Sequence, residues 1–192
     1  MKNLVTEVNA QLPPEFDGKI LLSYYNSPLG DMIIGVLDEG LCLLEFHDRI
    51  RLGKEFLQLA KELGAHYAEG GNEHSEKTIK ELDLYFNREL QHFTVPFVLT
   101  GTEFQRKVFE SLKEIPFGRT VTYKDQSLKL GDMKAIRAVA TANGVNRIAI
   151  MLPCHRVIGS DGSLVGYAGG IWRKKALIEL ESGSVQMQLS FE

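Results

Sequence analysis

The sequence contains no apolar run long enough to cross a membrane. Its longest such run, residues 148–152, is far shorter than the roughly 20 residues that a spanning helix needs. The N-terminal segment lacks the basic start and apolar stretch of a secretory signal, and internal repeats and low-complexity segments are missing too. We therefore expect a globular, cytoplasmic protein of one large domain or two small ones, with no membrane association.

Cysteine is scarce, with only two in 192 residues. A reducing compartment keeps such residues as thiols, so no disulfide is expected. Cys42 lies in an apolar, strand-like run, where a cysteine usually behaves as a small buried hydrophobe. Cys154 lies between Pro153 and the pair His155 and Arg156, a polar and cationic neighbourhood that favours the thiolate. Cys154 is therefore the candidate nucleophile.

Net charge is low over the whole chain but uneven along it. The formal charge of -3 combines an acidic half, residues 1–100 with 9 Lys and Arg against 16 Asp and Glu, and a basic half, residues 101–192 with 13 against 9. The basic half is suited to facing phosphate, although such a surplus is also ordinary on a solvated surface.

The first half of the sequence predicts a small α+β unit. Short apolar runs separated by turn formers at residues 20–46 indicate a β-meander. Apolar residues at helical spacing predict helices at 52–63 and 75–90. Residues 91–100, which contain Pro96, are interpreted as a connecting strand or linker. The predicted organisation is a domain at 1–92, a linker at 93–100, a second domain at 101–182 and a tail at 183–192 that can be disordered.

The second half predicts capped helices. Thr102 is placed to cap a helix that stops before Pro116, and Thr122 a short helix that ends near Gly131. Asp132 is placed to cap a third, alanine-rich helix that carries Arg137. A short helix, a glycine-bearing turn and a second helix form the pattern of a helix-turn-helix. Many helical pairs of this kind only pack a core, so the pattern alone does not establish DNA binding.

The adjacency of Cys154 and His155 does not by itself establish catalysis. Neighbouring side chains on a strand point in opposite directions, so a water would have to bridge the two groups. For a bare Cys-His pair, a buried thiol beside a surface histidine is the simpler interpretation.

The surrounding motifs change that interpretation. The runs NRIAIMLPCHRVI at 146–158, GYAGG at 166–170, GTEFQRKV at 101–108 and FGRTVTY at 117–123 occur in one order. Together they closely resemble the O6-alkylguanine-DNA alkyltransferases, also called methylated-DNA:protein-cysteine methyltransferases. The resemblance covers residues 101–182, and SPLG at 27–30 is similar to the family's smaller domain.

The resemblance implies an α+β fold: a small ribonuclease-H-like α/β domain followed by a mostly helical domain whose helix-turn-helix carries the active site. It also implies DNA repair in a single turnover, without cofactor or metal, by transfer of an alkyl group from O6-alkylguanine to Cys154, with O4-alkylthymine as a second candidate substrate. Because a thioether is a poor leaving group, the protein is consumed. The implied catalytic residues are Cys154, His155 as a base acting through water, Glu181 as its orienting carboxylate, Tyr123 as the group that stabilises the departing guanine, and Asn146 as a hinge amide.

The resemblance further implies that a nucleotide of double-stranded DNA is flipped out through the minor groove, with low sequence specificity, by a monomer. Arg137 matches the residue that fills the vacated space. Ala135, Ala138 and Ala142 are small enough for close approach, whereas Ile136 is bulkier than the alanine often found there. The remaining implied contacts are Thr122 with DNA, backbone groups of Val157 and Ala168 with the base, Tyr167 as a pocket wall, and Gly169 as the residue that leaves room for the substituent. Ala168 replaces a serine found in many relatives, so it offers an amide but no hydroxyl.

Three alternatives remain at this stage. A non-repairing, lesion-sensing alkyltransferase-like DNA-binding protein replaces the acceptor cysteine, which is present here as Cys154. A Cys-His hydrolase gains no support from DNA-binding-like helices. A DNA-binding regulator of this family needs a fused sensing domain or a zinc-ligand cluster, and the five scattered histidines provide none.

Overall fold

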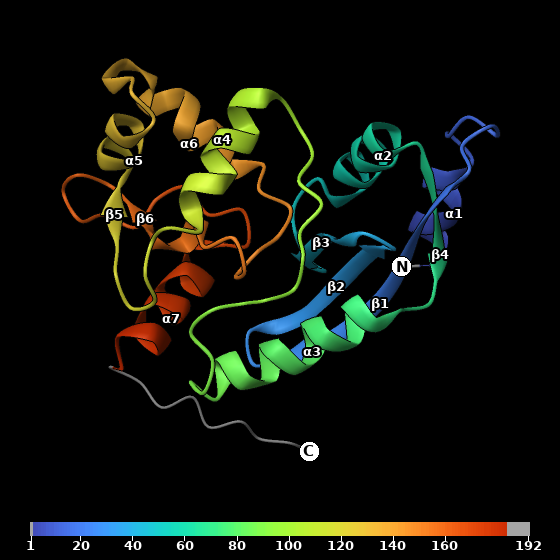
Figure 1. Cartoon of the computed structure of the whole chain (residues 1–192), viewed down its shortest axis with the longest axis horizontal. Helices are drawn as coiled ribbons and strands as arrows, with labels where there is room; N and C mark the ends of the chain where they lie inside the picture. The colour runs from blue at the N-terminus through green and yellow to red at the C-terminus, as the bar shows by residue number, and fades with distance from the viewer. Residues whose placement is uncertain (1, 184–192) are drawn as a thin grey trace. The chain divides into compact units, whose positions relative to one another are not determined.

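The computed structural model describes residues 2–183 and divides into two compact units, whose elements are labelled in Figure 1. The first unit runs to Lys80 and includes Thr94–Gly101, and the second contains Glu81–Phe93 and the chain from Thr102 onward. The division falls inside helix α3 (Glu73–Phe86) and not at residue 92. A continuous helix keeps one periodicity, so the sequence carries no signal for a boundary within it. Apart from Gly183, the predicted tail lies outside the described residues.

The first unit is built on a four-stranded sheet. Strands β1 (Gly18–Ser27), β2 (Gly30–Leu37) and β3 (Gly40–Phe46) form an antiparallel meander, as the sequence predicts. Strand β4 (Ala65–Glu69) pairs with β1 in parallel, which gives the order β3-β2-β1-β4. The parallel edge was not predicted, because five residues after a helix give only a weak alternating pattern.

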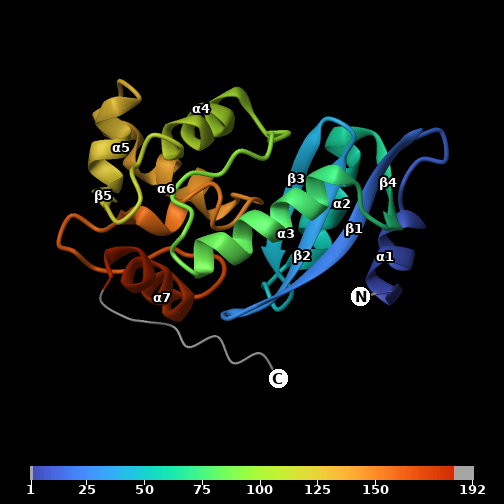
Figure 2. The same cartoon turned by 60° about the horizontal axis from the view of Figure 1, so that its bottom comes forward.

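Helices cover this sheet. Helices α1 (Lys2–Asn9) and α2 (Leu52–Leu63) pack on β4, and Figures 1 and 2 show α2 on the opposite face of the sheet from α3. The prediction for α2 is confirmed. Helix α3 ends at Phe86 instead of residue 90, because Arg88 adopts a left-handed φ of 64° and the next two amides turn back to the Leu84 carbonyl.

Cys42 is a core residue, as predicted. It is 1% exposed and lies where the register of β2 and β3 shifts, with Leu43 opposite Gly35 and Leu41 opposite Val36. The shift is a β-bulge, and the Cys42 thiol donates to the Gly35 carbonyl at 3.3 Å. The packing of this thiol gives it no route to a substrate.

The second unit is mostly helical. Its elements are α4 (Glu103–Leu112), β5 (Val121–Thr122), α5 (Tyr123–Lys129), the 3₁₀ turn η1 (Met133–Ala135), α6 (Ile136–Gly144), the 3₁₀ turn η2 (Cys154–Arg156), β6 (Val157–Ile158) and α7 (Ile171–Ser182). Thr102 and Thr122 cap α4 and α5, as predicted, and each forms a reciprocal capping box, with Gln105 and Asp125 respectively. Strands β5 and β6 pair in parallel and join the start of α5 to the end of η2.

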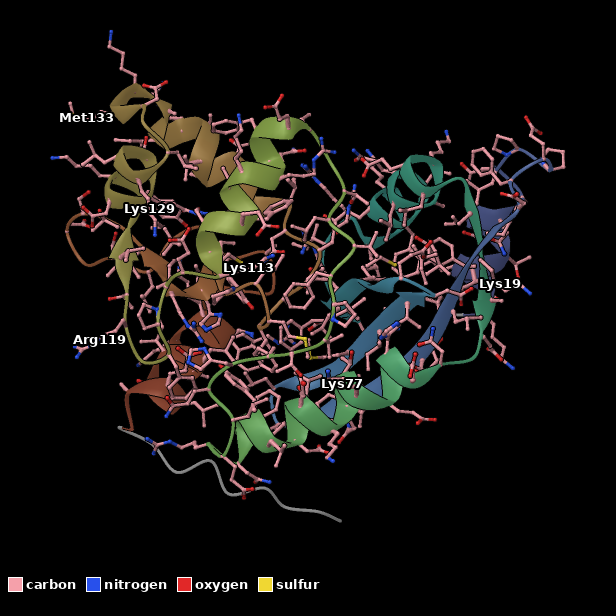
Figure 3. The ribbon with its side chains drawn as sticks, in the orientation of Figure 1. Lys19, Lys77, Lys113, Arg119, Lys129 and Met133 are labelled. Atoms are coloured by element: carbon pink, nitrogen blue, oxygen red, sulfur yellow. The ribbon has the colours of Figure 1, made fainter. Side chains whose placement is uncertain are left out.

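The predicted helix-turn-helix is present as α5 and α6, with one local difference. Asp132 caps η1, and the α-helix itself begins only at Ile136. Met133, at the start of η1, is 57% exposed and points away from the unit in Figure 3. Among residues 2–183, no helix is both long and apolar enough to span a membrane.

Candidate active site

The acceptor candidate Cys154 lies in a tight 3₁₀ turn, so the expectation that it lies on a strand is wrong. The Cys154 amide donates to the Leu152 carbonyl at 2.8 Å, and the turn closes with Arg156 N donating to the Pro153 carbonyl at 2.9 Å. In the preceding loop, Ile150 adopts a left-handed φ of 68°. A β-branched residue in this region is strained, and the surrounding fold must hold it there. Cys154 is 8% exposed.

The side-chain amide of Asn146 holds this loop. Its Oδ1 accepts from the Ile148 amide at 3.0 Å, and its Nδ2 donates to the Leu152 carbonyl at 2.8 Å. The same Nδ2 lies 3.3 Å from Cys154 Sγ, within reach of a hydrogen bond to sulfur. Asn146 is 3% exposed, so these contacts are shielded from water. A buried N–H donor beside the sulfur stabilises a thiolate and fixes its direction.

His155 and Glu181 form a buried pair. His155 Nε2 lies 2.8 Å from Glu181 Oε1, and their side chains are 0% and 2% exposed. Burial alone would raise the pKa of Glu181, but His155 and Arg156 lower it to about 2. An ionised carboxylate can only accept, so Nε2 carries the proton that forms this hydrogen bond. Glu181 is therefore not the solvated helix-end carboxylate that its sequence position alone suggests.

The other nitrogen of His155 is then a free base. Burial lowers the pKa of His155, the charges of Arg156 and Lys174 lower it further, and Glu181 opposes them. The imidazole is therefore neutral, with its lone pair on Nδ1. Nδ1 is buried and has no hydrogen-bond partner among the described residues. This atom can accept a proton, directly or through a water.

Two side chains that donate to Glu181 were missed by sequence reasoning. Arg156 donates through Nε to Oε2 at 2.8 Å and through Nη2 to Oε1 at 2.9 Å, and its Nη1 holds the Ile115 carbonyl at 2.6 Å. Tyr85, from α3, donates its hydroxyl to Oε1 at 2.7 Å. Arg156 was interpreted as a cation that favours the Cys154 thiolate, but the structure pairs its charge with Glu181.

Tyr123 is the first residue of α5 and follows strand β5, as expected. It is 7% exposed, and its hydroxyl donates to the Val165 carbonyl at 3.1 Å. Burial, with a smaller contribution from Cys154, raises the pKa of Tyr123 to about 12. The phenol is therefore a neutral proton donor at physiological pH. Gly166 has a φ of 66°, and a Cβ there would lie 2.9 Å from this hydroxyl, so a larger residue would be strained and would displace the Tyr123 hydroxyl.

Lys174 is a fully buried lysine that sequence reasoning missed. Its Nζ donates to the carbonyls of Val157 and Val165, at 2.5 and 2.6 Å, and lies 5.5 Å from the centre of the Tyr123 ring. Burial lowers the pKa of Lys174 to about 8, against an opposing effect of Cys154. A signal was available, because Lys174 shares the inward face of α7 with Leu177 and Glu181 at spacings of three and four.

Of the residues expected around the base, Tyr167, Ala168 and Gly169 lie on the loop between β6 and α7, and Val157 lies in β6. Tyr167 and Gly169 are buried, and Ala168 is exposed. The ring of Tyr167 meets that of His155 edge-on, with the ring centroids 6.5 Å apart, so Tyr167 forms a wall beside the proton-accepting imidazole. Val157 is buried, and its carbonyl already accepts from Lys174.

The residues expected to contact DNA lie on the helix-turn-helix. Arg137 and Ala138 are exposed on α6, and Ala135, Ile136 and Thr122 are half-buried. Ala142 is 2% exposed, so the expectation that it faces DNA is wrong: it lies one turn after Val139 on the buried face. Among residues 2–183, no group of three or more His, Cys, Asp or Glu could hold a metal ion.

Comparison with known proteins identifies this architecture. Residues 103–183 match the family model of the DNA binding domain of 6-O-methylguanine DNA methyltransferase, and residues 20–99 match that of its ribonuclease-like domain. A methylated-DNA--protein-cysteine methyltransferase of Methanosarcina barkeri is 38% identical over 85% of this chain and 99% of its own length. A protein of the same name from Mycobacterium tuberculosis H37Rv is 47% identical over 58% of this chain and 68% of its own.

Solved structures agree. The crystal structure of Mycobacterium tuberculosis OGT in complex with DNA has a TM-score of 0.72 and 35% identity, over 86% of this chain and 93% of that one. The O6-methylguanine-DNA methyltransferase of Pyrococcus kodakaraensis has a TM-score of 0.59 and 30% identity, over 84% and 98%. The predicted fold class, a ribonuclease-H-like α/β domain followed by a mostly helical domain with a helix-turn-helix, is confirmed.

Proposed function

Because the chain belongs to the 6-O-methylguanine DNA methyltransferase family, we propose that it repairs DNA by moving the alkyl group of an O6-alkylated guanine irreversibly to Cys154. It is a methylated-DNA--protein-cysteine methyltransferase and binds DNA. Two buried contacts carry the assignment of Cys154. The Asn146 amide lies 3.3 Å from the Cys154 sulfur, and Glu181 holds the adjacent His155 through Nε2, which leaves the Nδ1 lone pair of His155 free.

The first step is proton removal from the thiol. Nδ1 of His155 takes the proton of Cys154, directly or through a water. Glu181 stabilises the imidazolium that forms, and the Asn146 amide stabilises the thiolate. The charge on Lys174 adds to this effect, since its interaction with the Cys154 thiolate is favourable. The site thus supplies a nucleophile without a metal.

The second step is an in-line displacement at the alkyl carbon. A bond forms between Cys154 Sγ and carbon as the bond from carbon to guanine oxygen breaks, and the electron pair leaves with the guanine. Tyr123 stabilises the developing anion by donating its hydroxyl proton to the base. The proton first removed from Cys154 restores the phenol, so the products are neutral guanine and a thioether. A thioether does not leave, so each molecule acts once.

Access to the alkylated oxygen requires the nucleotide to leave the base stack. We propose that α6 approaches the minor groove of double-stranded DNA and that the exposed Arg137 fills the vacated space. Lys134 and Arg137 make no ion pair within residues 2–183, so both are free to meet phosphate or base. Contacts of these side chains with the sugar-phosphate backbone of DNA predict low sequence specificity. Thr122, Ala135, Ile136 and Ala138 complete the proposed DNA surface, and Val157, Tyr167, Ala168 and Gly169 the pocket for the base.

All of these groups come from one chain, so the proposed active form is a monomer. An acceptor thiol must stay reduced, which supports a cytoplasmic location. O4-alkylthymine, with the same alkyl–oxygen linkage, is a second possible substrate. The lesion-sensing alternative is not favoured, because Cys154 is present with a base and a thiolate donor beside it.

The direct test is the mass of the intact protein after incubation with an oligonucleotide that contains O6-methylguanine. The expected product is heavier by one methylene, with the modification on the peptide that contains Cys154. Cys154→Ala should give no product, and Cys42→Ala should react normally. An unchanged wild-type mass would disprove the proposed function.

A further inference from the structure

Tyr85 reaches the centre of the site from helix α3, outside every motif of the sequence. It is 0% exposed, and its hydroxyl donates to Glu181 Oε1 at 2.7 Å. That oxygen is also the one that accepts from His155 Nε2 at 2.8 Å. One carboxylate oxygen therefore joins Tyr85 to the base of the proposed reaction.

The hydroxyl of Tyr85 is not needed to pack its ring. Its ring meets Phe86, Phe93 and Phe117 with centroids 5.3, 5.3 and 5.9 Å away, an apolar shell that a phenylalanine would fill equally well. A phenol without a partner in such a shell would be costly, and the Glu181 carboxylate is the partner. Burial, followed by the charge of Glu181, raises the pKa of Tyr85, so this phenol remains a donor across the working pH range.

Several groups donate hydrogen bonds to the carboxylate of Glu181. They are His155 Nε2, Tyr85 Oη, two nitrogens of Arg156 and the Gly118 amide. Each hydrogen bond withdraws charge from the carboxylate and weakens its hold on an imidazolium. The two neutral donors besides His155 are the Tyr85 hydroxyl and the Gly118 amide. Tyr85 donates to Oε1, the oxygen that faces His155, whereas Gly118 donates to Oε2, so Tyr85 has the greater effect on the imidazole.

We propose that Tyr85 is a positioning residue for alkyl transfer: its hydroxyl fixes Glu181 Oε1 against His155 Nε2 and keeps the imidazole neutral, with Nδ1 free to take the Cys154 proton. The inference rests on the proposed roles of His155 and Glu181. The titratable and charged groups that face His155 or its carboxylate are Arg156 of η2, Lys174 and Glu181 of α7, Tyr167 of the loop before α7 and Tyr85 of α3; Cys154 precedes His155 in the chain.

The direction of the effect follows from the charge. Transfer needs neutral His155, so its rate falls as the pH drops through the pKa of the imidazole. Tyr85→Phe leaves more negative charge on Glu181, which stabilises the imidazolium and raises that pKa. The acid limb of the rate profile should move up by about half a pH unit, so that transfer below the limb is about threefold slower.

The test compares Tyr85→Phe with Tyr67→Phe in the full chain. Tyr67 is a matched control, because it is 4% exposed and its hydroxyl makes a buried hydrogen bond to the Phe56 carbonyl at 2.9 Å, in the first unit. Single-turnover methylation by an O6-methylguanine duplex is followed between pH 5 and 9. Only Tyr85→Phe should move the acid limb, and an unmoved limb, or equal shifts in both variants, would overturn the inference.

A second variant covers the case in which Tyr85→Phe does not fold. Placing 3-fluorotyrosine at position 85 alone keeps the hydroxyl and makes it a stronger donor, so the acid limb should move to lower pH. An unchanged limb would again overturn the inference. Wild-type protein that does not methylate Cys154 at any pH would instead overturn the proposed function, so the two failures are distinct.

Discussion

Nε2 of His155 and Oε1 of Glu181 are 2.8 Å apart, between two buried side chains. This contact fixes the tautomer of the imidazole, because the ionised carboxylate cannot donate. It also places the base, Nδ1, on the side of the ring away from Glu181. Glu181, which lies 26 positions after His155 in the chain, therefore determines which ring nitrogen acts as the base.

Glu181→Gln tests this relationship. The amide removes the negative charge that stabilises the imidazolium and leaves the buried guanidinium of Arg156 without its ion pair. We expect single-turnover methylation at pH 7.5 to slow by about 100-fold and stability to fall by about 3 kcal/mol. Glu179→Gln, on the same helix, removes a long contact to exposed Lys175 and should change neither quantity. Equal rates for the two variants would exclude an orienting role for Glu181.

Asn146→Ala tests the loop that carries the nucleophile. The substitution removes the side-chain contacts to Ile148, Leu152 and Cys154, so we expect stability to fall by about 2 kcal/mol and transfer to slow by about tenfold. Asn143→Ala is the control, since it removes a buried hydrogen bond of 2.7 Å to Gln126 that does not reach the loop. Thermal unfolding and methylation rates are measured for both. A normal rate in Asn146→Ala would show that the amide serves stability alone.

Much of the fold was predictable because its signals are local. Threonine before a helix caps that helix, and short apolar runs between turn residues form a meander, so α4, α5 and β1 to β3 match their predictions. The end of α3 was not predictable, because Arg88 is not a glycine and gives no sign of its left-handed backbone.

The residues of the site also divide into those that the sequence identified and those that it did not. Cys154 and His155 are adjacent, and the family resemblance identified them together with Tyr123, Asn146 and Glu181. Tyr85, by contrast, contacts Glu181 across 96 positions, and an apolar face with Tyr and Phe predicts only core packing. Lys174 was overlooked because a lysine in a surface helix is expected to be solvated. Long-range polar contacts of this kind are decided by tertiary packing, which periodicity does not contain.

Arg137→Ala separates base flipping from chemistry. Arg137 is exposed on α6 and has no ion pair within the described chain, and the proposed role acts only when a base must leave a duplex. We expect methylation by duplex DNA to slow by about tenfold or more, while reaction with free O6-benzylguanine stays unchanged. Arg119→Ala is the control, since Arg119 is another exposed arginine, outside the helix-turn-helix and labelled in Figure 3. If reaction with duplex DNA and reaction with the free base slowed equally, the proposed role of Arg137 in base flipping would be wrong.

Lys174→Met tests the buried ammonium. The thioether side chain fills a similar volume but removes the ammonium donor from the carbonyls of Val157 and Val165, of which Val165 keeps the Tyr123 hydroxyl as a donor. We therefore expect a loss of about 2 kcal/mol. We also expect slower methylation at pH 7, because the favourable charge near the Cys154 thiolate is lost. Lys175→Met, at the exposed neighbouring position, should leave both quantities unchanged.

The same variant gives a pH dependence whose sign follows from the lowered pKa of Lys174. Between the folded value of about 8 and the unfolded value of 10.5, the unfolded chain binds more protons at this side chain than the folded chain. The contribution of Lys174 to stability therefore rises with pH across this window, since the neutral amine still donates to both carbonyls. The difference in unfolding free energy between wild type and Lys174→Met should widen from pH 8 to 10.5. A difference that narrows over this range would mean that the folded state favours the charged form of Lys174.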